Sequence, residues 1–301
     1  MQICLLSSIT NCKYLLLSIH LPNPLTLQSV KRLACLLITL ALWAVAVVSV
    51  YAQTFSPLST QGLSMGEALG GTEDVLNLHA QPALALDTGL HAATSGRAIG
   101  GSIYYQGAAA VAVSRKSGWQ YGAFAAQLGN SLYAQNQLGA AASYRVGSAR
   151  LGLSASYEQR RFGTYSTGGR LTFSMGVQMQ VASRVQLYSA INNLAQARFE
   201  NYETERRHNP LQGRIGMAYT PNAQVRILLE ASKEMEHDTR IHGGLQYTPL
   251  KWLVLRAGAQ SAPFAPSAGA GLRWRALQFD YAFTQANLAG TGQAVSIGYR
   301  W

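Results

Sequence analysis

Hydrophobic and polar residues alternate with a period of two along much of the chain after residue 87. The clearest stretch is Leu171–Val181, where Leu, Phe, Met and Val occupy every second position and Thr, Ser, Gly and Gln lie between them. Successive side chains of a β-strand point to opposite faces, so this period predicts a strand with one apolar and one polar face. A half-buried strand of a soluble sandwich would show the same pattern.

The alternation recurs in the segments 151–158, 225–231, 253–260, 277–284 and 295–301. The charged residues of these segments fall on the polar positions. A charge that faces lipid at the middle of a membrane costs about 2–4 kcal/mol. If the strands cross a membrane, their polar positions must face the interior of a barrel, because a register shift of one residue would move every charge into lipid.

The connections between the segments predict the number of strands. Turn-forming residues mark short connections at 115–118, 146–149, 182–184, 220–223, 248–251 and 275–276. Longer connections are expected at 95–101, 129–137, 160–169, 193–210, 233–239, 261–266 and 285–292. With a first strand near 88–95 and a last strand near 293–301, the six short turns predict fourteen strands, and twelve is the alternative count. Short turns on one side and longer loops on the other are typical of bacterial outer-membrane barrels.

The first 52 residues have the features of an export signal. A basic pair at 31–32 precedes the apolar run 33–50, and a Val-x-Ala sequence ends at Ala52. This order predicts a presequence over residues 1–52 that is cleaved after Ala52. A retained transmembrane helix is the alternative interpretation of the apolar run. Export and a strand-rich remainder predict a location in the bacterial outer membrane.

Composition narrows the possible functions further. The three cysteines, Cys4, Cys12 and Cys35, all precede residue 52, so the exported chain has neither a disulfide scaffold nor a cysteine metal site. The net charge is +11, but no Lys/Arg-rich run occurs. Scattered basic residues argue against a nucleic-acid partner. They fit better as a pore lining or as contacts to anionic lipid headgroups.

These observations predict an all-β chain, a transmembrane antiparallel β-barrel of about fourteen strands with a short N-terminal plug or hatch segment. Residues 53–87 lack sustained alternation and are expected to form the plug ahead of the barrel domain 88–301. The predicted lumen-lining residues are Arg145, Glu158, Gln178, Gln180, Arg214, Arg226, Glu230, Arg256, Arg273, Arg275 and Asp280. They would form either a network of ion pairs that fills the barrel or a pore lining that favours anions.

Candidate chemistry outside the lumen is sparse. Acids and a histidine cluster at 234–238 in one predicted loop, where a cation site and a solvated loop tip are both possible. A mixed-charge run lies at 203–208, and His242 could meet Ser189 and Ser232 if the strand register permits. Phosphate-binding loops, dinucleotide fingerprints and Cys/His metal patterns are missing from the sequence. We therefore predict no enzyme, no cofactor and no metal site.

Two motifs resemble those of known barrel families. The last seven residues, VSIGYRW, resemble the C-terminal strand that barrel assembly machinery recognises, so Tyr299 and Trp301 are the expected assembly signal. The stretch ALGGTEDVLNL followed by HAQPAL resembles the N-terminal region of FadL-type barrels and of the PorV/PorQ-like group related to them. In that region an Asn-Pro-Ala motif follows a glycine-containing stretch. Here the expected hatch motif is His79, Gln81, Pro82 and Ala83, with Gln in place of Asn.

Segments 189–194, 230–247 and 288–297 resemble the second half of PorV/PorQ-like proteins, and the loose likeness covers most of residues 62–301. The resemblance implies a fourteen-stranded barrel and two functions. FadL-type members pass hydrophobic molecules inward past an N-terminal hatch, so a conduit for small hydrophobic solutes is expected. PorV-like members serve type IX secretion, so a plugged secretion or attachment partner is the alternative. Expected partners are outer-membrane lipid, lipopolysaccharide, barrel assembly machinery and, for the alternative, secretion-system components.

Overall fold

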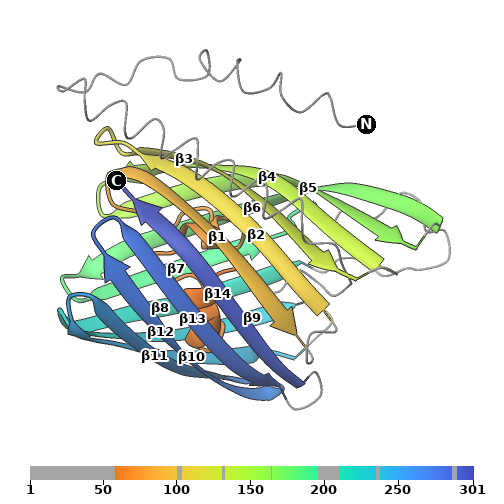
Figure 1. Cartoon of the computed structure of the whole chain (residues 1–301). Helices are drawn as coiled ribbons and strands as arrows, with labels where there is room; N and C mark the ends of the chain where they lie inside the picture. The colour runs from red at the N-terminus through yellow and green to blue at the C-terminus, as the bar shows by residue number, and fades with distance from the viewer. Residues whose placement is uncertain are drawn as a thin grey trace, which may run out of the picture. The chain divides into compact units, whose positions relative to one another are not determined.

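A computed structural model describes residues 58–99, 104–130, 133–163, 165–195, 211–234, 238–286 and 290–301. The predicted presequence 1–52, its cleavage site and the charged run 203–208 lie outside these residues. Two short helices precede fourteen strands along the described chain (Figure 1). No helix in the described ranges is both long and apolar enough to cross a membrane.

The helical elements are the α-helix α2 (Thr60–Ser64) and the 3-10 helix η2 (Val75–His79). The strands are β1 (Gly89–Ile99), β2 (Tyr104–Ser114), β3 (Trp119–Gly129), β4 (Tyr133–Val146), β5 (Ala149–Phe162), β6 (Tyr165–Ala182), β7 (Val185–Asn192), β8 (Gln212–Asn222), β9 (Val225–Glu234), β10 (Arg240–Leu250), β11 (Leu253–Ser261), β12 (Phe264–Trp274), β13 (Leu277–Ala286) and β14 (Gly290–Arg300).

The strands form one closed barrel in which each strand pairs with its neighbours in sequence and β1 pairs with β14. All of the pairs are antiparallel, and the seam between β1 and β14 runs without a bulge from His91↔Arg300 to Ile99↔Gly292. The predicted fourteen-stranded antiparallel barrel is therefore confirmed. The beginning of β1 and the end of β14 lie at the same end of the barrel as the six short turns (Figure 1). We call this the short-turn end.

Six short turns join the strands as the sequence predicts, but two of them lie later than predicted, at 223–224 and 251–252 instead of 220–223 and 248–251. Most connections at the opposite end are shorter than predicted. The predicted loop 160–169 is wrong, because residues 159–161 of β5 pair with residues 167–169 of β6. The predicted loops 129–137 and 261–266 likewise shrink to 130–132 and 262–263. These strand ends are rich in glycine and polar residues, which remain paired with the neighbouring strand without apolar contacts. In the sequence, such residues look like a loop. The long connection that remains is 193–211.

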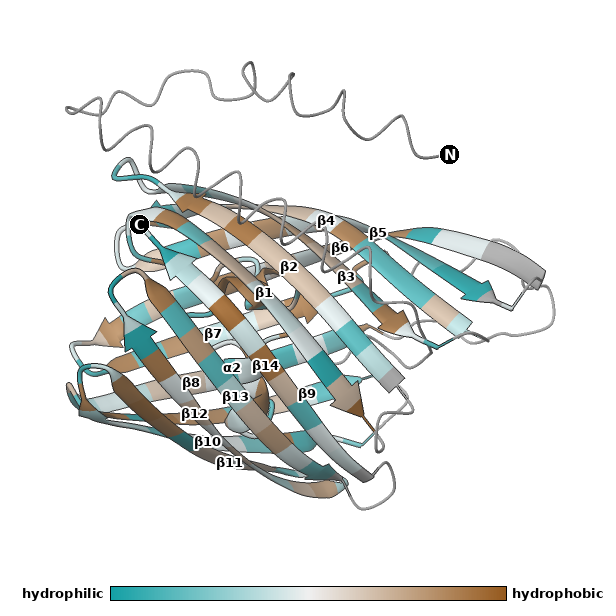
Figure 2. Ribbon diagram, in the orientation of Figure 1, coloured by the Kyte–Doolittle hydropathy of each residue, from teal (hydrophilic) through white to brown (hydrophobic). Residues whose placement is uncertain are grey.

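The outer face of the barrel is apolar and exposed. Phe173 and Met175 of β6 are 46% and 45% exposed, whereas Thr172 and Ser174 between them are 5% and 8% exposed. Hydrophobic positions recur around the wall in Figure 2. Near the short-turn end Trp119 stacks on Tyr121 with 5.6 Å between ring centroids. An apolar belt with aromatic residues at its edge is typical of a barrel that lies in lipid.

Residues 58–88, which we call the enclosed segment, lie inside the barrel ahead of β1 (Figure 1). Each of its two helical turns has a side-chain cap. The Ser59 hydroxyl accepts a hydrogen bond from Gly62 N at 2.9 Å, and the Asp74 carboxylate accepts one from Leu76 N at 3.1 Å. These caps satisfy amide groups at the start of each helix, which have no partner within the helix.

Candidate functional site

The enclosed segment packs on a smooth, apolar part of the inner wall. Five of its leucines and Val75 form one buried cluster with alanines and Phe124 of β2, β3 and β4. The members are Leu58, Val75, Leu76, Leu78, Leu84, Leu86, Ala108, Ala110, Ala112, Phe124, Ala126 and Ala141. Each fully buried leucine contributes about 1.5–3 kcal/mol. Both faces of β2 are therefore apolar, which explains why residues 107–113 (GAAAVAV) lack the polar alternation of the other strands.

On the other side of the barrel the segment approaches the wall through glycines. A Cβ added at Gly70 would lie 2.2 Å from the Tyr188 ring of β7. Gly66 has φ +71, and a Cβ there would lie 2.4 Å from the carbonyl oxygen of Ala259 in β11. Larger residues at either position would push the segment away from the wall. The glycine-containing stretch is thus a contact surface as well as a turn.

Backbone groups of the enclosed segment are paired with side chains of the wall. Gln178 of β6 accepts a hydrogen bond from Ala85 N at 2.7 Å. Gln120 of β3 donates to Leu84 O at 2.9 Å and accepts from Leu86 N at 3.3 Å. The segment is not part of a sheet, so its buried N–H and C=O groups need such partners. The inward glutamines therefore hold the segment rather than line an open channel at these positions.

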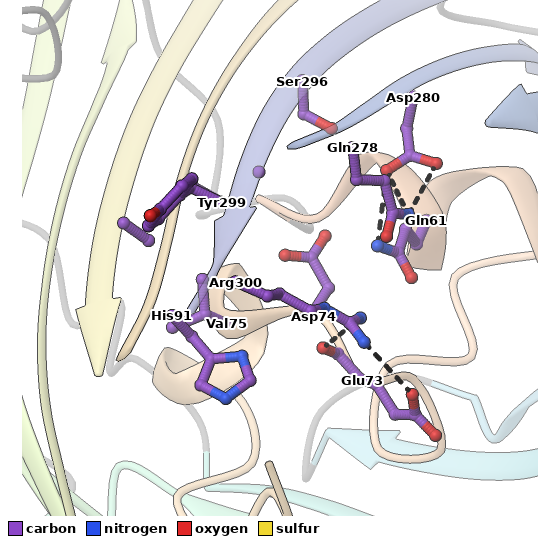
Figure 3. Close-up of a pocket in the computed structure, with 13 residues that line it drawn as sticks. Gln61, Glu73, Asp74, Val75, His91, Gln278, Asp280, Ser296, Tyr299 and Arg300 are labelled. Carbon is purple, nitrogen blue, oxygen red and sulfur yellow. Dashed lines mark hydrogen bonds and ion pairs between the residues drawn. The ribbon is translucent and has the colours of Figure 1, made fainter. Parts of the chain in front are cut away.

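A buried charge network connects the segment to the seam side of the barrel. Asp280 of β13 accepts hydrogen bonds from Arg256 Nη1 at 2.6 Å and from Gln278 Nε2 at 2.8 Å. Gln61 of α2 donates to the same carboxylate at 3.3 Å. Figure 3 shows Gln61 and Gln278 converging on Asp280. The Arg256 and Asp280 side chains are 0% and 3% exposed, so neither charge is solvated by bulk water.

Two further ion pairs lie deeper along the wall. Glu230 of β9 binds Arg214 of β8 at 2.7 Å and accepts a hydrogen bond from Gly70 N at 3.0 Å. Glu158 of β5 pairs with Arg170 of β6. A buried charge needs such a partner, because isolation from water would otherwise destabilise the fold by several kcal/mol. Glu158 and Glu230 are thus each neutralised by an arginine of a neighbouring strand.

Glu73 joins the segment to two strands at the short-turn end. Its carboxylate contacts Arg226 of β9 at 2.5 Å. It also contacts Arg300 of β14 at 3.7 Å (Figure 3). Burial tends to raise the pKa of Glu73, but the charges of Arg226 and Arg300 outweigh this effect and hold the pKa below its usual value. The carboxylate is therefore ionised at neutral pH. Beside it, a cavity of about 20 Å³ between the segment and β1, β13 and β14 has room for about one water molecule.

The predicted hatch motif lies against β5, β6 and β7. Gln81 donates hydrogen bonds to the carbonyl oxygens of Val177 at 3.3 Å and Ser189 at 3.4 Å. A Cβ added at Gly152 of β5 would lie 2.4 Å from the carbonyl of Pro82, so a glycine in the wall makes room for the motif. Ala83 is fully buried. The motif residues are thus held at the wall by backbone contacts.

The predicted lumen-lining residues divide into groups by position. Glu158, Gln178, Glu230, Arg256 and Asp280 are buried inside the barrel, and Arg214, Arg226 and Arg273 are half-buried there. Arg145, Gln180 and Arg275 are exposed at the short-turn end, away from the enclosed segment.

Other residues of the network were not predicted. Gln61, Asp74, Gln120 and Arg170 were missed because the segment gives no periodic signal and because a polar residue in a strand does not reveal its partner. A buried polar residue on an otherwise apolar strand, such as Gln120 in β3, is the signal that could have found one of them.

The Ser/His arrangement that the sequence suggested is present in part. Ser232 Oγ lies 2.8 Å from His242 Nε2, and His242 Nδ1 lies 2.8 Å from the carbonyl oxygen of Gly66. Ser189 is not part of this group, because it lies on the opposite face of its strand from the inward Tyr188 and donates to Arg214 O at 2.9 Å. The carbonyl of Gly66 fixes the ring, so His242 connects the segment to β9 and β10.

Residues 235–237 of the predicted acid and histidine cluster lie outside the described residues. Within the ranges that the structure describes, no group of three or more His, Cys, Asp or Glu side chains is placed to hold a metal ion.

His79 gives the enclosed segment a pH dependence. Burial lowers the pKa of His79 from 6.5 to about 4, although its contact with the Leu76 carbonyl favours the charged ring. The unfolded state therefore binds a proton at a higher pH than the folded state does. The contribution of the neutral His79 to the free energy of unfolding is therefore present above pH 6.5. It is lost as the pH falls toward 4, by on the order of 2–3 kcal/mol.

We expect the urea midpoint of the protein in detergent to fall between pH 7 and pH 5, and the fall to be smaller for His79→Asn. Asparagine can keep a hydrogen bond to Leu76 O but does not titrate, so acidic residues contribute equally to both curves. An identical pH dependence in the two proteins would contradict a buried neutral His79.

Comparison with known proteins supports the fold. No protein-family model and no curated protein sequence matches the chain. Among solved structures, a Pseudomonas aeruginosa FadL homologue matches with a TM-score of 0.58 and 11% identity, over 84% of this chain and 98% of that one. The Pseudomonas putida toluene transporter TodX matches with a TM-score of 0.59 and 10% identity, over 84% of this chain and 99% of that one. The chain thus has the fold of FadL/TodX channels.

Proposed function

We propose that the chain is a bacterial outer-membrane barrel that passes small hydrophobic solutes, with the enclosed segment acting as the hatch. The observation that carries this proposal is the apolar contact between the leucines of the segment and the alanine-lined inner wall of β2–β4. If the segment moves, this wall becomes an apolar surface inside the barrel. The fold of the FadL homologue and of TodX, which is described as a toluene transporter, supports the same function.

The proposed location follows from the outer surface and the termini. An exposed apolar belt surrounds a closed barrel whose first and last strands meet at the short-turn end. Barrels of this type have short turns in the periplasm. We propose that residues 1–52 are the export presequence, cleaved after Ala52, and that Tyr299 and Trp301 form the signal read by barrel assembly machinery. Trp301 also completes the seam, where its carbonyl accepts a hydrogen bond from Leu90 N at 2.7 Å.

A disulfide between the segment and the wall tests the hatch. A Cβ added at Gly244 of β10 would lie 2.6 Å from Cβ of Met65 and 2.7 Å from its carbonyl oxygen, so the segment must shift by about 1 Å here to bring the pair to the disulfide range of about 3.5–4.5 Å. Because all three native cysteines precede residue 52, the exported protein has a cysteine-free background. We expect Met65→Cys/Gly244→Cys to block toluene uptake into cells when oxidised and to restore it when reduced.

The two single-cysteine variants are the controls, since they carry the same substitutions without the cross-link. Uptake that is equal in the oxidised and reduced double variant would show that the segment need not move. Uptake that never exceeds that of a strain lacking the protein would overturn the conduit itself.

A second function is favoured by a different observation. The interior is held by three buried ion pairs and many hydrogen bonds to the segment, which suits a barrel that stays plugged. A plugged barrel would serve as a secretion or attachment partner of the PorV/PorQ-like type. Co-purification of type IX secretion components from native outer membranes, together with no effect of the cross-link on any solute, would favour this alternative.

A further inference from the structure

The six short turns carry most of the exposed positive charge at the short-turn end. Five of the turns have at least one exposed basic side chain in the turn or directly beside it. These residues, which we call the basic ring, are Arg115, Lys116, Arg145, Arg184, Lys251 and Arg275. Exposed negative charge at the same end is limited, within the described chain, to Asp87, the half-exposed Glu73 and the C-terminal carboxylate.

The basic ring has no acidic partner of its own. Within the described part of the chain, the ion pairs at this end involve Glu73 with Arg226 and Arg300, and none involves a member of the ring. Arg145 donates to the carbonyl of Gly147 at 3.2 Å, a contact that orders the side chain without neutralising it. Six positive charges are therefore presented together to whatever lies at this end.

The opposite end of the barrel has a different balance. Its described acids include Glu67, Glu158, Glu230 and Glu234, and two of them already pair with arginines. Acidic and basic residues are thus interspersed at that end of the described chain, and Arg170 and Arg214 are paired with acids. The two ends therefore differ in how their charged side chains are paired. The basic ring is for this reason more than the result of a general excess of arginine.

The ring lies directly on the water side of aromatic residues that mark the edge of the apolar belt. Trp119 begins β3 after the turn that holds Arg115 and Lys116, and its ring packs on Tyr144 with centroids 4.7 Å apart. Lys251 precedes Trp252, and Arg275 follows Trp274 with its guanidinium 5.7 Å from the indole centroid. Tryptophan and tyrosine prefer the depth of lipid headgroups. Basic side chains just beyond them lie where lipid phosphates are found.

We propose that the basic ring binds the phosphate groups of anionic phospholipids in the leaflet at the short-turn end. This inference rests on the proposed membrane location but not on the proposed passage of solutes. An acidic protein partner is less suited to the arrangement, because the charges are spread around the circumference of the barrel and five of the six, all except Arg184, adjoin a tryptophan or tyrosine at the edge of the apolar belt. A layer of separate headgroups fits such a ring.

The test uses the full protein purified in detergent and mixed with equal amounts of phosphatidylglycerol and phosphatidylethanolamine. Native mass spectrometry then counts the lipids retained. We expect phosphatidylglycerol to be retained over phosphatidylethanolamine by on the order of tenfold, because each basic residue near an anionic surface contributes severalfold. Raising the salt concentration from about 50 to about 500 mM should reduce the preference, since exposed charges are screened.

A variant with the six ring residues changed to glutamine is expected to lose the preference. The control changes three basic residues of the opposite end, Arg161, Lys233 and Arg240, to glutamine; it matches either half of the ring in the number of charges removed and should keep the preference. If the sixfold variant does not assemble, the triples R115Q/K116Q/R145Q and R184Q/K251Q/R275Q should each lose part of the preference. Equal retention of both lipids by the wild-type protein, or an equal loss in the control, would overturn the proposal.

Two additions separate the source of the phosphate and the kind of partner. Full displacement of phosphatidylglycerol by glycerol phosphate would indicate a site for free phosphates, and full displacement by polyglutamate would indicate an acidic protein partner; either result contradicts a lipid site. Lipid retention is measured without solute flux. A failed uptake experiment therefore leaves this proposal standing, and a failed lipid experiment leaves the conduit standing.

Discussion

Asp280→Ala is expected to lower the free energy of unfolding by about 3–5 kcal/mol. The substitution removes the carboxylate that neutralises Arg256, whose side chain is 0% exposed, and it also removes the acceptor for Gln278 and Gln61. Arg256 would keep its hydrogen bond to Gln246 but lose its acidic partner, and an uncompensated charge at this depth destabilises the fold more than the loss of one hydrogen bond does. Urea unfolding in detergent micelles, followed by tryptophan fluorescence, measures the change.

Glu73→Ala is the matched control, because Glu73 also pairs with arginine but keeps 45% of its side chain exposed. Exposed ion pairs contribute less than about 1 kcal/mol. A similar loss of stability in the two variants would contradict the assignment of Asp280 as the buried charge that the fold depends on. A variant that replaces both Arg256 and Asp280 by glutamine and asparagine should recover part of the loss, since no unpaired charge remains.

The second large effect is expected on the outer face. Met175→Arg of β6 should disfavour insertion into phospholipid vesicles by about 2–4 kcal/mol, because it places a charge near the middle of the apolar belt. Val181→Arg on the same face of the same strand lies beside the turn, where the cost falls to about 0–1 kcal/mol. The two positions have almost equal exposure in the folded barrel, 45% and 46%. Equilibrium folding into vesicles at several urea concentrations measures both, and equal effects would show that β6 does not cross the membrane at this depth.

The barrel could be predicted from the sequence because its main signal is local. Leu171–Val181 alternates over its whole length, and Gly, Pro, Asn or Ser interrupt the pattern at or beside most of the six short turns. The strand ends opposite the short turns could not be predicted in the same way. Arg160 and Arg161 are polar and close to glycines, yet they stay in the ladder because the partner strand β6 extends beside them.

The enclosed segment illustrates the limit of local patterns more clearly. Its position depends on contacts with residues far away in sequence, such as Gly70 with Glu230 and Gln61 with Asp280. The alternating pattern predicts that Glu230, Asp280 and Gln178 face inward, but it carries no information that their partners are groups of the segment. The inward face of β2 has polar residues only at its two ends, Gln106 and Ser114, so the alanines between them read like a buried core strand.

The seam between β1 and β14 has a consequence for the order of assembly. His91 pairs with Arg300, and Leu90 exchanges hydrogen bonds with Trp301, so the wall cannot close before the last residues of the chain are available. The enclosed segment is synthesised before every strand that surrounds it. Its leucines can pack on β2–β4 early, but its contact with Asp280 of β13 forms only in the slow, long-range part of assembly. A factor that shields residues 58–88 during this interval, or releases them last, would control how fast the barrel forms.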